Sequence, residues 1–593
     1  MLSHNNMRKL FLLLFVLLAL PAFAVQREVG SGQTYPTIGA CITAASAGDI
    51  CNVHAGTYNT AIIINKSITV QANPGDSPVI NITGLGGIAV YISANGVIFD
   101  GFEVLGYGSV AVGSSGVYVN SGVVGAQIKN CKVHDGYGNG IRGNGANGPF
   151  LIDNCEIYGA LQHAGVGLSG DGIDIISGTS SDGTFANGNT ISNTLVHDSQ
   201  IDGIKIHGQY FTIRDSHIYD NISELGAHSD GIQFLKVTTN VQHARVFNNI
   251  ISNHSQNIYV ECTAASPCTD LQFWGNVIYN SPGVVNGVDM ETFLSAGLVL
   301  TGGAGCGEGV LVYNNTFGRH SHRAVDMAGC SDGTAEFKNN IIKNDLGNGF
   351  MTGVTAYFTA GKFDYNMISA PNNPVYLIHW NGVFHTTYAA FQAAVTNQQQ
   401  NGSGGAASFV NEAGTDYHLS AATIAGLTLA SPWNLDYDGV TRGGDGTWDI
   451  GAFEYVASGA PVFQTVVGTS TLRMGLSGGT QTVTITNVGN ASTDGITTAT
   501  FILTLPTGLT ATALSGTGWG GANCTPSGLT CTRSDVLTAT SSYPVLTLTY
   551  SLAKSTAPTV TTEANGTGGG TAGTSTGQGD ITATAFKGLG LAP

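Results

Sequence analysis

A short phrase recurs three times in the chain, as Asp171-Gly172-Ile173, Asp202-Gly203-Ile204 and Asp230-Gly231-Ile232. The copies start 31 and 28 residues apart (202 − 171 and 230 − 202). Self-similarity with a period of about 20–50 residues is typical of a solenoid, in which each repeat forms one coil. Neighbouring coils would lie about 4.8 Å apart, the usual spacing of paired strands. The three aspartates are therefore expected to stack in one column.

A second repeated phrase predicts an internal ladder of small polar side chains. Each member of the ladder follows an apolar residue by three positions, as in Ile128–Cys131 and Ile152–Cys155. Stacked amide side chains can hydrogen-bond to the coils above and below, which satisfies them in a buried position. The pattern predicts about ten coils between Ile88 and Ile368. The ladder column reads Cys131, Cys155, Thr194, Ser216, Asn249, Asn276, Asn315, Asn340 and Asn366.

The rest of the sequence divides into a leader, a cap and a separate C-terminal region. Residues 1–24 have a basic start, an apolar centre and a small-x-small end, which predicts a secretory signal peptide. Residues 25–455 are predicted to form the β-helix with an N-terminal cap and, over about 370–455, a C-terminal cap. In that C-terminal cap, Asp436, Asp438 and Asp449 are interpreted as turn-forming residues, with a structural ion as the alternative.

A linker over 456–461 precedes residues 462–593, where β-branched stretches alternate with Gly and Pro turns. This composition predicts a small β-sandwich. The segments 487–490 and 505–509 resemble the immunoglobulin-like repeats of bacterial surface proteins. The predicted fold class is therefore all-β, a parallel β-helix followed by a β-sandwich.

The composition limits the compartment and the partners. Only 10% of the 593 residues are charged, and the formal net charge is −17. An acidic balance argues against nucleic acid and anionic membranes as partners. No second apolar stretch long enough to span a membrane follows residues 1–24. We therefore expect a monomer that is secreted or held at the cell surface.

The ten cysteines fall into five close pairs. An even count in an exported protein predicts disulfides. Two of the pairs are 24 residues apart, about one coil, which suits the distance that a disulfide spans. Buried free thiols are the alternative. The pairs are Cys41/Cys51, Cys131/Cys155, Cys262/Cys268, Cys306/Cys330 and Cys524/Cys531.

Charged and polar side chains converge around the aspartate column. In the predicted register, the residue three positions after each aspartate points outward, as does the residue two positions further along. The first of these columns reads Arg142, Asp174, Lys205, Gln233 and Tyr259; the second reads Asn144, Ile176, His207, Leu235 and Glu261. This density of charge in a chain with few charged residues is the strongest functional signal in the sequence.

Two segments, 171–174 and 202–205, resemble the Asp-rich calcium pattern of lysine-base pectate lyases, in the pectate-lyase-like superfamily of right-handed β-helices. The resemblance implies Ca²⁺-dependent β-elimination in an extended, uronate-containing polysaccharide. Ca²⁺ takes several carboxylate oxygens, which would relieve the repulsion within the column. The implied residues are Asp171, Asp174, Asp202 and Asp230 for the metal; Lys205, Arg142 and His207 for catalysis, with Lys236 as an alternate base; and His228, Gln233, Tyr259 and Glu261 for the substrate.

Two other functions stay open at this point. Residues 170–174 resemble one motif of polygalacturonases, and Asp171 and Asp230, two coils apart, would have backbones about 9.6 Å apart, which is compatible with an inverting hydrolase. Asp-Gly is also a common turn opening, so the column is equally compatible with a non-catalytic glycan-binding surface protein or adhesin. The lyase is the favoured hypothesis.

Overall fold

The computed structural model describes most of the chain and divides it into two compact units. The first unit comprises Met1–Gly183 and Asn187–Gln200, and the second comprises Thr184–Ala186 and Ile201–Pro593. The predicted signal peptide lies almost wholly outside the described residues. The described residues are 24–584 except 110–113, 146–147, 162–169, 181, 222–228, 236–240, 263–267, 282–283, 286–287, 290–294, 303–305, 328–333, 345–347, 353–357, 371–376, 445, 457–460, 490, 555–558 and 572.

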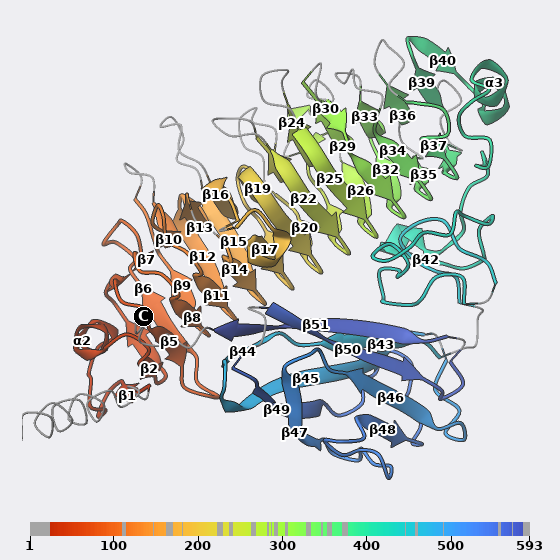
Figure 1. The fold of residues 1–593 in the computed structure, drawn as a ribbon. Helices are drawn as coiled ribbons and strands as arrows, with labels where there is room; N and C mark the ends of the chain where they lie inside the picture. The colour runs from red at the N-terminus through yellow and green to blue at the C-terminus, as the bar shows by residue number, and fades with distance from the viewer. Residues whose placement is uncertain are drawn as a thin grey trace, which may run out of the picture. The chain divides into compact units, whose positions relative to one another are not determined.

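In the first unit, short parallel strands recur in three sheets, and successive coils add strands to each sheet (Figure 1). Sheet A contains β1 (Gln26–Val29), β2 (Ile50–Val53), β5 (Thr69–Ala72), β8 (Ile98–Asp100), β11 (Gln127–Lys129), β14 (Leu151–Asp153) and β17 (Asn189–Ser192). Sheet B contains β3 (Gly56–Tyr58), β6 (Pro78–Asn81), β9 (Glu103–Leu105), β12 (Lys132–Tyr137), β15 (Glu156–Leu161) and β18 (Leu195–His197). Sheet C contains β4 (Ile62–Ile64), β7 (Val90–Ile92), β10 (Ser115–Val119), β13 (Asn139–Asn144) and β16 (Ile173–Gly178).

The second unit has the same three sheets. Sheet A contains the last part of β19 (Ile204–Arg214), then β22 (Gln242–Phe247), β25 (Cys268–Trp274), β30 (Cys306–Glu308), β31 (Leu311–Tyr313), β34 (Glu336–Lys338) and β37 (Phe363–Asp364). Sheet B contains β20 (His217–Tyr219), β23 (Ile250–Ser252), β26 (Val277–Ser281), β32 (Thr316–His320), β35 (Ile341–Lys343) and β38 (Met367–Ser369). Sheet C contains the first part of β19, then β21 (Asp230–Phe234), β24 (Gln256–Glu261), β29 (Ala296–Thr301), β33 (Arg323–Met327), β36 (Asn348–Thr352), β39 (Ile378–Trp380) and β40 (Val383–His385).

A small β-sandwich follows, as the change in composition predicts. One of its sheets has the strand order β43 (Phe463–Val467), β45 (Ser477–Asn487), β49 (Leu546–Leu552), β47 (Leu509–Ser515). The other has the order β44 (Ser470–Arg473), β51 (Ser575–Thr584), β50 (Thr559–Thr567), β46 (Ala499–Thr504), β48 (Thr530–Arg533). Alternate residues of these strands face inward, and Ile485, Phe501 and Tyr550 are fully buried in the core.

The predicted amide ladder is present in the second unit and is fully buried. Each asparagine donates from Nδ2 to Oδ1 of the next, over distances of 2.8–3.0 Å from Asn249 through Asn276, Asn315 and Asn340 to Asn366. Asn366 then donates to Gln399 Oε1 at 3.1 Å, which extends the ladder beyond the residues that the period predicts. These bonds hold successive coils in register, because a slip of one residue would leave every amide unsatisfied.

The recurring Asp-Gly-Ile phrase has a packing role in each coil. The isoleucines Ile173, Ile204 and Ile232 are fully buried, so each fills the interior of its coil. A Cβ on Gly231 would lie 2.5 Å from the backbone oxygen of Asn257 in the next coil, so no side chain fits there. The phrase is thus explained by a coil interior that needs one apolar residue beside one residue with no side chain.

Each unit also contains a short α-helix. Helix α2 (Ile38–Ala44) is capped by Thr37 Oγ1, which accepts from the backbone N–H of Ala40 at 3.2 Å. Helix α3 (Tyr388–Ala394) has the same kind of cap from Thr387. The remaining short elements are β27 (Val284–Val285), β28 (Val288–Asp289), β41 (Phe409–Asn411), β42 (Asp416–Leu419), η1 (Phe185–Asn187) and η3 (Glu412–Gly414).

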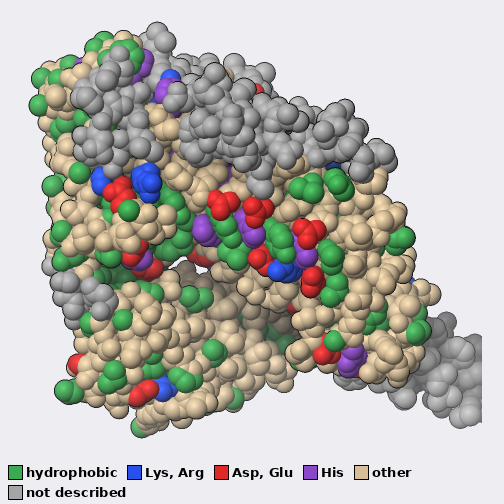
Figure 2. Space-filling view, turned by 180° about the vertical axis from the view of Figure 1, so that it is seen from behind, with side chains coloured by type: hydrophobic (Ala, Val, Ile, Leu, Met, Phe, Trp, Pro, Cys, Tyr) green, Lys and Arg blue, Asp and Glu red, His purple; other side chains and the backbone are tan. Residues whose placement is uncertain are grey.

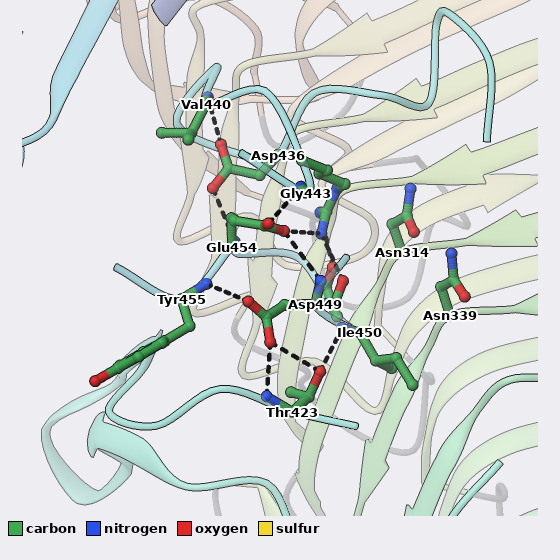
Figure 3. A network of polar contacts seen from close by, with 12 residues as sticks. Asn314, Asn339, Thr423, Asp436, Val440, Gly443, Asp449, Ile450, Glu454 and Tyr455 are labelled. Carbon is green, nitrogen blue, oxygen red and sulfur yellow. Dashed lines mark hydrogen bonds and ion pairs between the residues drawn. The ribbon is translucent and has the colours of Figure 1, made fainter. Parts of the chain in front are cut away.

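The C-terminal cap is held by buried carboxylates that accept backbone N–H groups (Figure 3). Asp436 accepts from Val440 at 2.7 Å and from Glu454 at 2.9 Å. Asp449 accepts from the backbone N–H of Thr423 at 2.6 Å and of Tyr455 at 2.9 Å. These are turn-stabilising bonds, so Asp436 and Asp449 behave as turn formers and not as ion ligands.

Burial raises the pKa of two carboxyl groups in this cap. The pKa of Glu454 rises to about 8 and that of Asp436 to about 7, with the charge of Asp438 adding to the effect on Asp436. The fully buried Arg442 donates to the backbone oxygens of Asp449, Gly451 and Ala452 and lies 3.9 Å from Glu454. The cap therefore holds more buried acids than cations.

The cysteines confirm three predicted disulfides and correct one. Cys41–Cys51, Cys262–Cys268 and Cys524–Cys531 are bonded. Cys131 and Cys155 are buried free thiols, so the predicted disulfide between these coils is wrong. The Sγ of Cys131 lies 3.0 Å from the backbone oxygen of Lys129, and the Sγ of Cys155 lies 3.4 Å from that of Asp153. These two thiols act as members of the polar ladder. Cys306/Cys330 involves side chains outside the described residues.

The all-β prediction is confirmed, and in the described part of the chain no helix is long and apolar enough to cross a membrane. The immunoglobulin-like identity of the sandwich stays a prediction.

Candidate functional site

The outer face of sheet C in the second unit carries the predicted column of polar residues. Lys205 on β19 pairs with Gln233 on β21, and Gln233 pairs with Tyr259 on β24, as the sequence register predicts. Glu261, two residues further along β24, pairs with Thr301 on β29. Neighbouring residues Ile204 and Ile206 point into the core, so the alternation of the strand turns Lys205 outward.

Lys205 is bound to a buried carboxylate at the start of its own coil. Its Nζ lies 2.8 Å from Asp202 Oδ2, and its side chain is 14% exposed whereas that of Asp202 is 1% exposed. The other oxygen of Asp202 accepts the backbone N–H of Asp230 at 3.0 Å. Gln233 in turn donates from Nε2 to Asp230 Oδ2 at 2.9 Å. The aspartates thus lie beneath the outward column and hold its members in place.

The electrostatics of this cluster are dominated by burial. Burial raises the pKa of Asp202, the Lys205 ammonium opposes that shift, and the nearby Asp230 carboxylate adds to it. Burial also raises the pKa of Tyr259 to about 12, with further contributions from Glu261 and Asp230. Tyr259 therefore stays a neutral phenol at any pH near neutrality, able to donate one hydrogen bond.

The remaining predicted residues of this unit have different surroundings. His207 lies on β19 but is only 5% exposed, so a ligand would have little access to its ring. Glu261 is partly exposed at the end of β24. His228 and the alternate base Lys236 lie outside the described residues.

The first unit holds the other predicted residues. Arg142 on β13 pairs in register with Asp174 on β16, and Arg142 Nε lies 3.4 Å from Asp174 Oδ2. Asn139 donates to the same Asp174 oxygen at 3.0 Å. Asp171 is fully buried, and its backbone N–H donates to Asn139 Oδ1 at 3.2 Å. Arg142 is thus committed in part to an ion pair, which weakens its predicted role as a grip for substrate.

Asn139 belongs to the same repeated column, and the sequence already held the signal. Asn139-Gly140-Ile141 repeats the Asp-Gly-Ile phrase with an amide in place of the acid. A Cβ on Gly140 would lie 2.6 Å from the backbone oxygen of Gly172 in the next coil. The first position of the phrase therefore accepts either an amide or an acid, as expected of a residue that bonds to neighbouring coils.

The predicted calcium site is not formed by the described residues. Among them, no group of three or more His, Cys, Asp or Glu side chains is arranged to hold a metal ion. Asp202 and Asp230 use their oxygens on Lys205, Gln233 and a backbone N–H. The Lys205 ammonium takes the place next to Asp202 that a cation would need, so this column does not fit Ca²⁺.

Charged side chains are sparse over the surface and gather in places. Figure 2 shows one face on which acidic, basic and histidine side chains lie in a band, while most of the rest is uncharged.

Comparison with known proteins supports the fold. Residues 139–306 match the family model described as a right handed beta helix region. No curated protein matches the chain in sequence.

Several solved structures are distantly similar. Pectate lyase Pel9A is 15% identical, with 54% of this chain and 80% of that chain covered and a TM-score of 0.38. XylC in complex with xylose is 12% identical, with coverage of 55% and 76% and a TM-score of 0.38. An alginate lyase from Paenibacillus sp. str. FPU-7 is 15% identical, with coverage of 53% and 96% and a TM-score of 0.34. Likeness at this level carries no information on activity. Residues 139–306 thus match a right handed beta helix region, and the parallel sheets show that the fold is a parallel β-helix.

Proposed function

We propose that the protein binds an extended acidic polysaccharide along the outer face of sheet C in its second unit and cleaves it by β-elimination. Lys205 is the proposed proton acceptor. The observation that carries this proposal is the 2.8 Å contact between the Lys205 amine and the buried Asp202. The outward column around Lys205 also supplies the phenol of Tyr259, which suits a sugar hydroxyl group.

The buried carboxyl answers the main chemical difficulty of a lysine base. An ammonium must lose its proton before it can accept another. Burial raises the pKa of Asp202, and this carboxyl is the group beside Lys205 that can share its proton, so the proposed step uses the lysine as its neutral amine. The amine then takes the C5 proton of a uronate, the electron pair forms the C4–C5 double bond, and the C4–O bond breaks. The leaving oxygen takes a proton from water. No metal step is included, because the described column does not fit Ca²⁺.

The test is the ultraviolet absorbance of unsaturated uronate, followed on pectate, alginate and glycosaminoglycan panels with Ca²⁺ and with chelator. We expect absorbance to rise on at least one acidic polymer, to persist with chelator, and to disappear in Lys205→Ala. Lys129→Ala is a matched control, because Lys129 also pairs with an aspartate, at 3.7 Å from Asp100, but lies far along the chain in sheet A. Absence of any rise across the panels contradicts the proposal.

A second candidate, binding without cleavage, is favoured by the same ion pair. An ammonium beside a carboxylate is stabilised in its charged form, which suits the capture of an acidic sugar better than proton abstraction. Under this alternative the polymer binds, its chain length does not fall, and no absorbance develops. Hydrolysis has less support, because Asp171 and Asp230 are both 0% exposed. New reducing ends without absorbance would nevertheless establish it.

A further inference from the structure

An arginine without a carboxylate partner lies on sheet A of the second unit. Arg245 on β22 pairs in register with Thr212 on β19 and Gln272 on β25. No hydrogen bond or ion pair joins the side chain of Arg245 to any residue that the structure describes, and its Nε is buried without a hydrogen-bond partner. Its guanidinium carbon lies 3.8 Å from the centre of the Phe185 ring. Arg245 is thus held from one side by a ring and left unsatisfied in hydrogen bonding.

The aromatic neighbours of Arg245 form a connected surface. The rings of Tyr210 and His243 stack with centres 4.5 Å apart and planes inclined by 16°. Phe185 meets Tyr210 edge-on, with ring centres 5.6 Å apart. The name "sheet A patch" is used below for Phe185, Tyr210, Thr212, His243, Arg245 and Gln272.

Asp270, the acid whose charge acts on Arg245, is already committed to other groups. Asp270 Oδ2 lies 2.7 Å from His243 Nδ1, and Asp270 Oδ1 accepts from Gln272 Nε2 at 3.0 Å. The Asp270 charge acts on Arg245 through space but forms no ion pair with it. Burial lowers the pKa of Arg245, as expected for a cation that is partly desolvated and not directly neutralised.

Other arginines of this unit show what is unusual here. Arg214 lies on the neighbouring strand β19 and Arg323 on β33 of sheet C, and each contacts a carboxylate, on Asp215 and Asp326 respectively. The chain has 21 basic and 38 acidic residues, so an acid is easily placed beside any cation. A buried donor left without a partner is costly and calls for an explanation, which a ligand supplies.

We propose that the sheet A patch is a second glycan site, in which Arg245 binds the carboxylate of an acidic sugar. The planar guanidinium offers paired N–H donors that match a carboxylate, and the hydroxyl of Thr212 and the amide of Gln272 lie on either side for sugar hydroxyl groups. The proposal rests on the proposed substrate class, an acidic polysaccharide, but not on its cleavage.

The position of the patch suits a long polymer that also reaches Lys205. Strand β19 carries Lys205 in its sheet C part and Thr212 in its sheet A part. Between them, Gly208 has a φ of +146°, a conformation that favours glycine, and there the strand passes from one sheet to the other. Seven residues of extended strand span at most about 23 Å. A polymer of several sugars is long enough to contact both places.

The test measures binding of polygalacturonate in a Lys205→Ala background, where cleavage is not expected. Arg245→Gln should weaken the affinity for polygalacturonate about tenfold, since hydrogen bonds to charged groups are the strong ones. Arg214→Gln is the matched control, because Arg214 lies on the neighbouring strand with an acidic partner, and it should leave affinity unchanged. Arg245→Lys keeps the charge but not the fork and should give an intermediate loss.

Three results would overturn the inference. These are equal affinity with and without Arg245→Gln, no binding of polygalacturonate by the parent, and an equal loss of affinity for neutral xylan, which would mean that Arg245 only braces Phe185. Melting temperatures of all variants guard against loss of fold, and Arg245→Lys supplies the answer if Arg245→Gln unfolds. A failure of the proposed cleavage can be distinguished from a failure of the second glycan site, because the absorbance assay on the wild type measures cleavage and does not involve Arg245.

Discussion

The outer faces of sheets C and A, which meet along β19, each carry one basic side chain, but in opposite electrostatic surroundings. On sheet C, Lys205 is 2.8 Å from Asp202, which is itself buried and further bonded. On sheet A, Arg245 rests on Phe185 and has no acidic partner among the described residues. A paired amine beside a carboxyl of raised pKa can exchange a proton, whereas an unpaired guanidinium can only hold an anion. The outer face of sheet C is therefore suited to cleaving the polymer, and the outer face of sheet A to binding it.

The largest effect is expected when the pairing on sheet C is removed. Asp202→Asn takes away the proposed proton acceptor of Lys205. We predict a fall in the rate of unsaturated product of about 100-fold, with affinity for polygalacturonate unchanged or higher. Single-turnover rates and binding curves on the same preparation check this. A rate close to that of the wild type would show that Asp202 only positions Lys205.

A smaller effect is expected when the support of the guanidinium is changed. Phe185→Leu removes the ring over Arg245 but keeps an apolar side chain. A cation–π contact is worth about 0.5–1 kcal/mol at an exposed site, so affinity for polygalacturonate should fall about two- to fivefold. Calorimetric titration of Phe185→Leu beside the parent measures this. The product rate on short oligomers should not change, and a change there would contradict the separation of the two faces.

Salt should act more strongly on the half-buried, unpaired guanidinium of Arg245 than on the buried pair of Lys205 and Asp202. Raising the ionic strength from about 0.05 M to about 0.5 M screens exposed charges but reaches buried pairs much less. We predict that the part of the affinity lost in Arg245→Gln shrinks to less than twofold at the higher salt. Titrations of parent and variant at both salt concentrations measure this difference. A difference that persists at high salt would indicate that Arg245 acts by shape and not by charge.

The C-terminal cap differs from both faces, because its buried acidic side chains outnumber its buried cations. We expect these acids to affect the stability of the fold and not the binding or cleavage of a polymer. The folded-state pKa values of Asp436 and Glu454, about 7 and about 8, lie above their ordinary values, so both carboxyl groups bind protons more tightly in the folded chain. The stability that they contribute is present below about pH 4 and is lost as the pH rises to about 8. The pKa of His418, raised to about 9 by Asp438 and Asp416, acts in the same direction from about pH 6.5 upward.

Scanning calorimetry should therefore show the melting temperature of the solenoid falling by several degrees between about pH 5 and pH 8. Glu454→Gln should flatten that slope, because the amide does not ionise. A melting temperature that rises over this interval would contradict the account of the cap.

The features that the sequence predicts best are those that depend on the repeat length of the coils. The ladder from Asn249 to Asn366 and the column of Lys205, Gln233 and Tyr259 both follow from aligning coils, and both are confirmed in the second unit. Period fixes which residues share a column but not how deeply each one is buried. That is why Asp202 and Asp230 were predicted to hold an ion, although they lie beneath the face and bond to their neighbours.

Other features depend on contacts that no period encodes. The free thiols of Cys131 and Cys155 reflect the direction of two side chains toward backbone oxygens, which spacing does not reveal. The sheet A patch depends on Phe185, which lies outside the sheets and has no counterpart in the repeat. The sequence does not distinguish Arg245 from the other arginines. Its lack of an acidic partner is visible only when the ion pairs of the other arginines are known.

The most direct test compares Lys205→Gln and Arg245→Gln on the same acidic polymer, with product formation and binding measured in parallel. The account predicts that Lys205→Gln abolishes unsaturated product while binding stays within about threefold of the wild type. It predicts that Arg245→Gln raises KM about tenfold while kcat is unchanged. If both substitutions lower binding and kcat together by similar factors, the two faces do not divide reaction from retention, and the account is wrong.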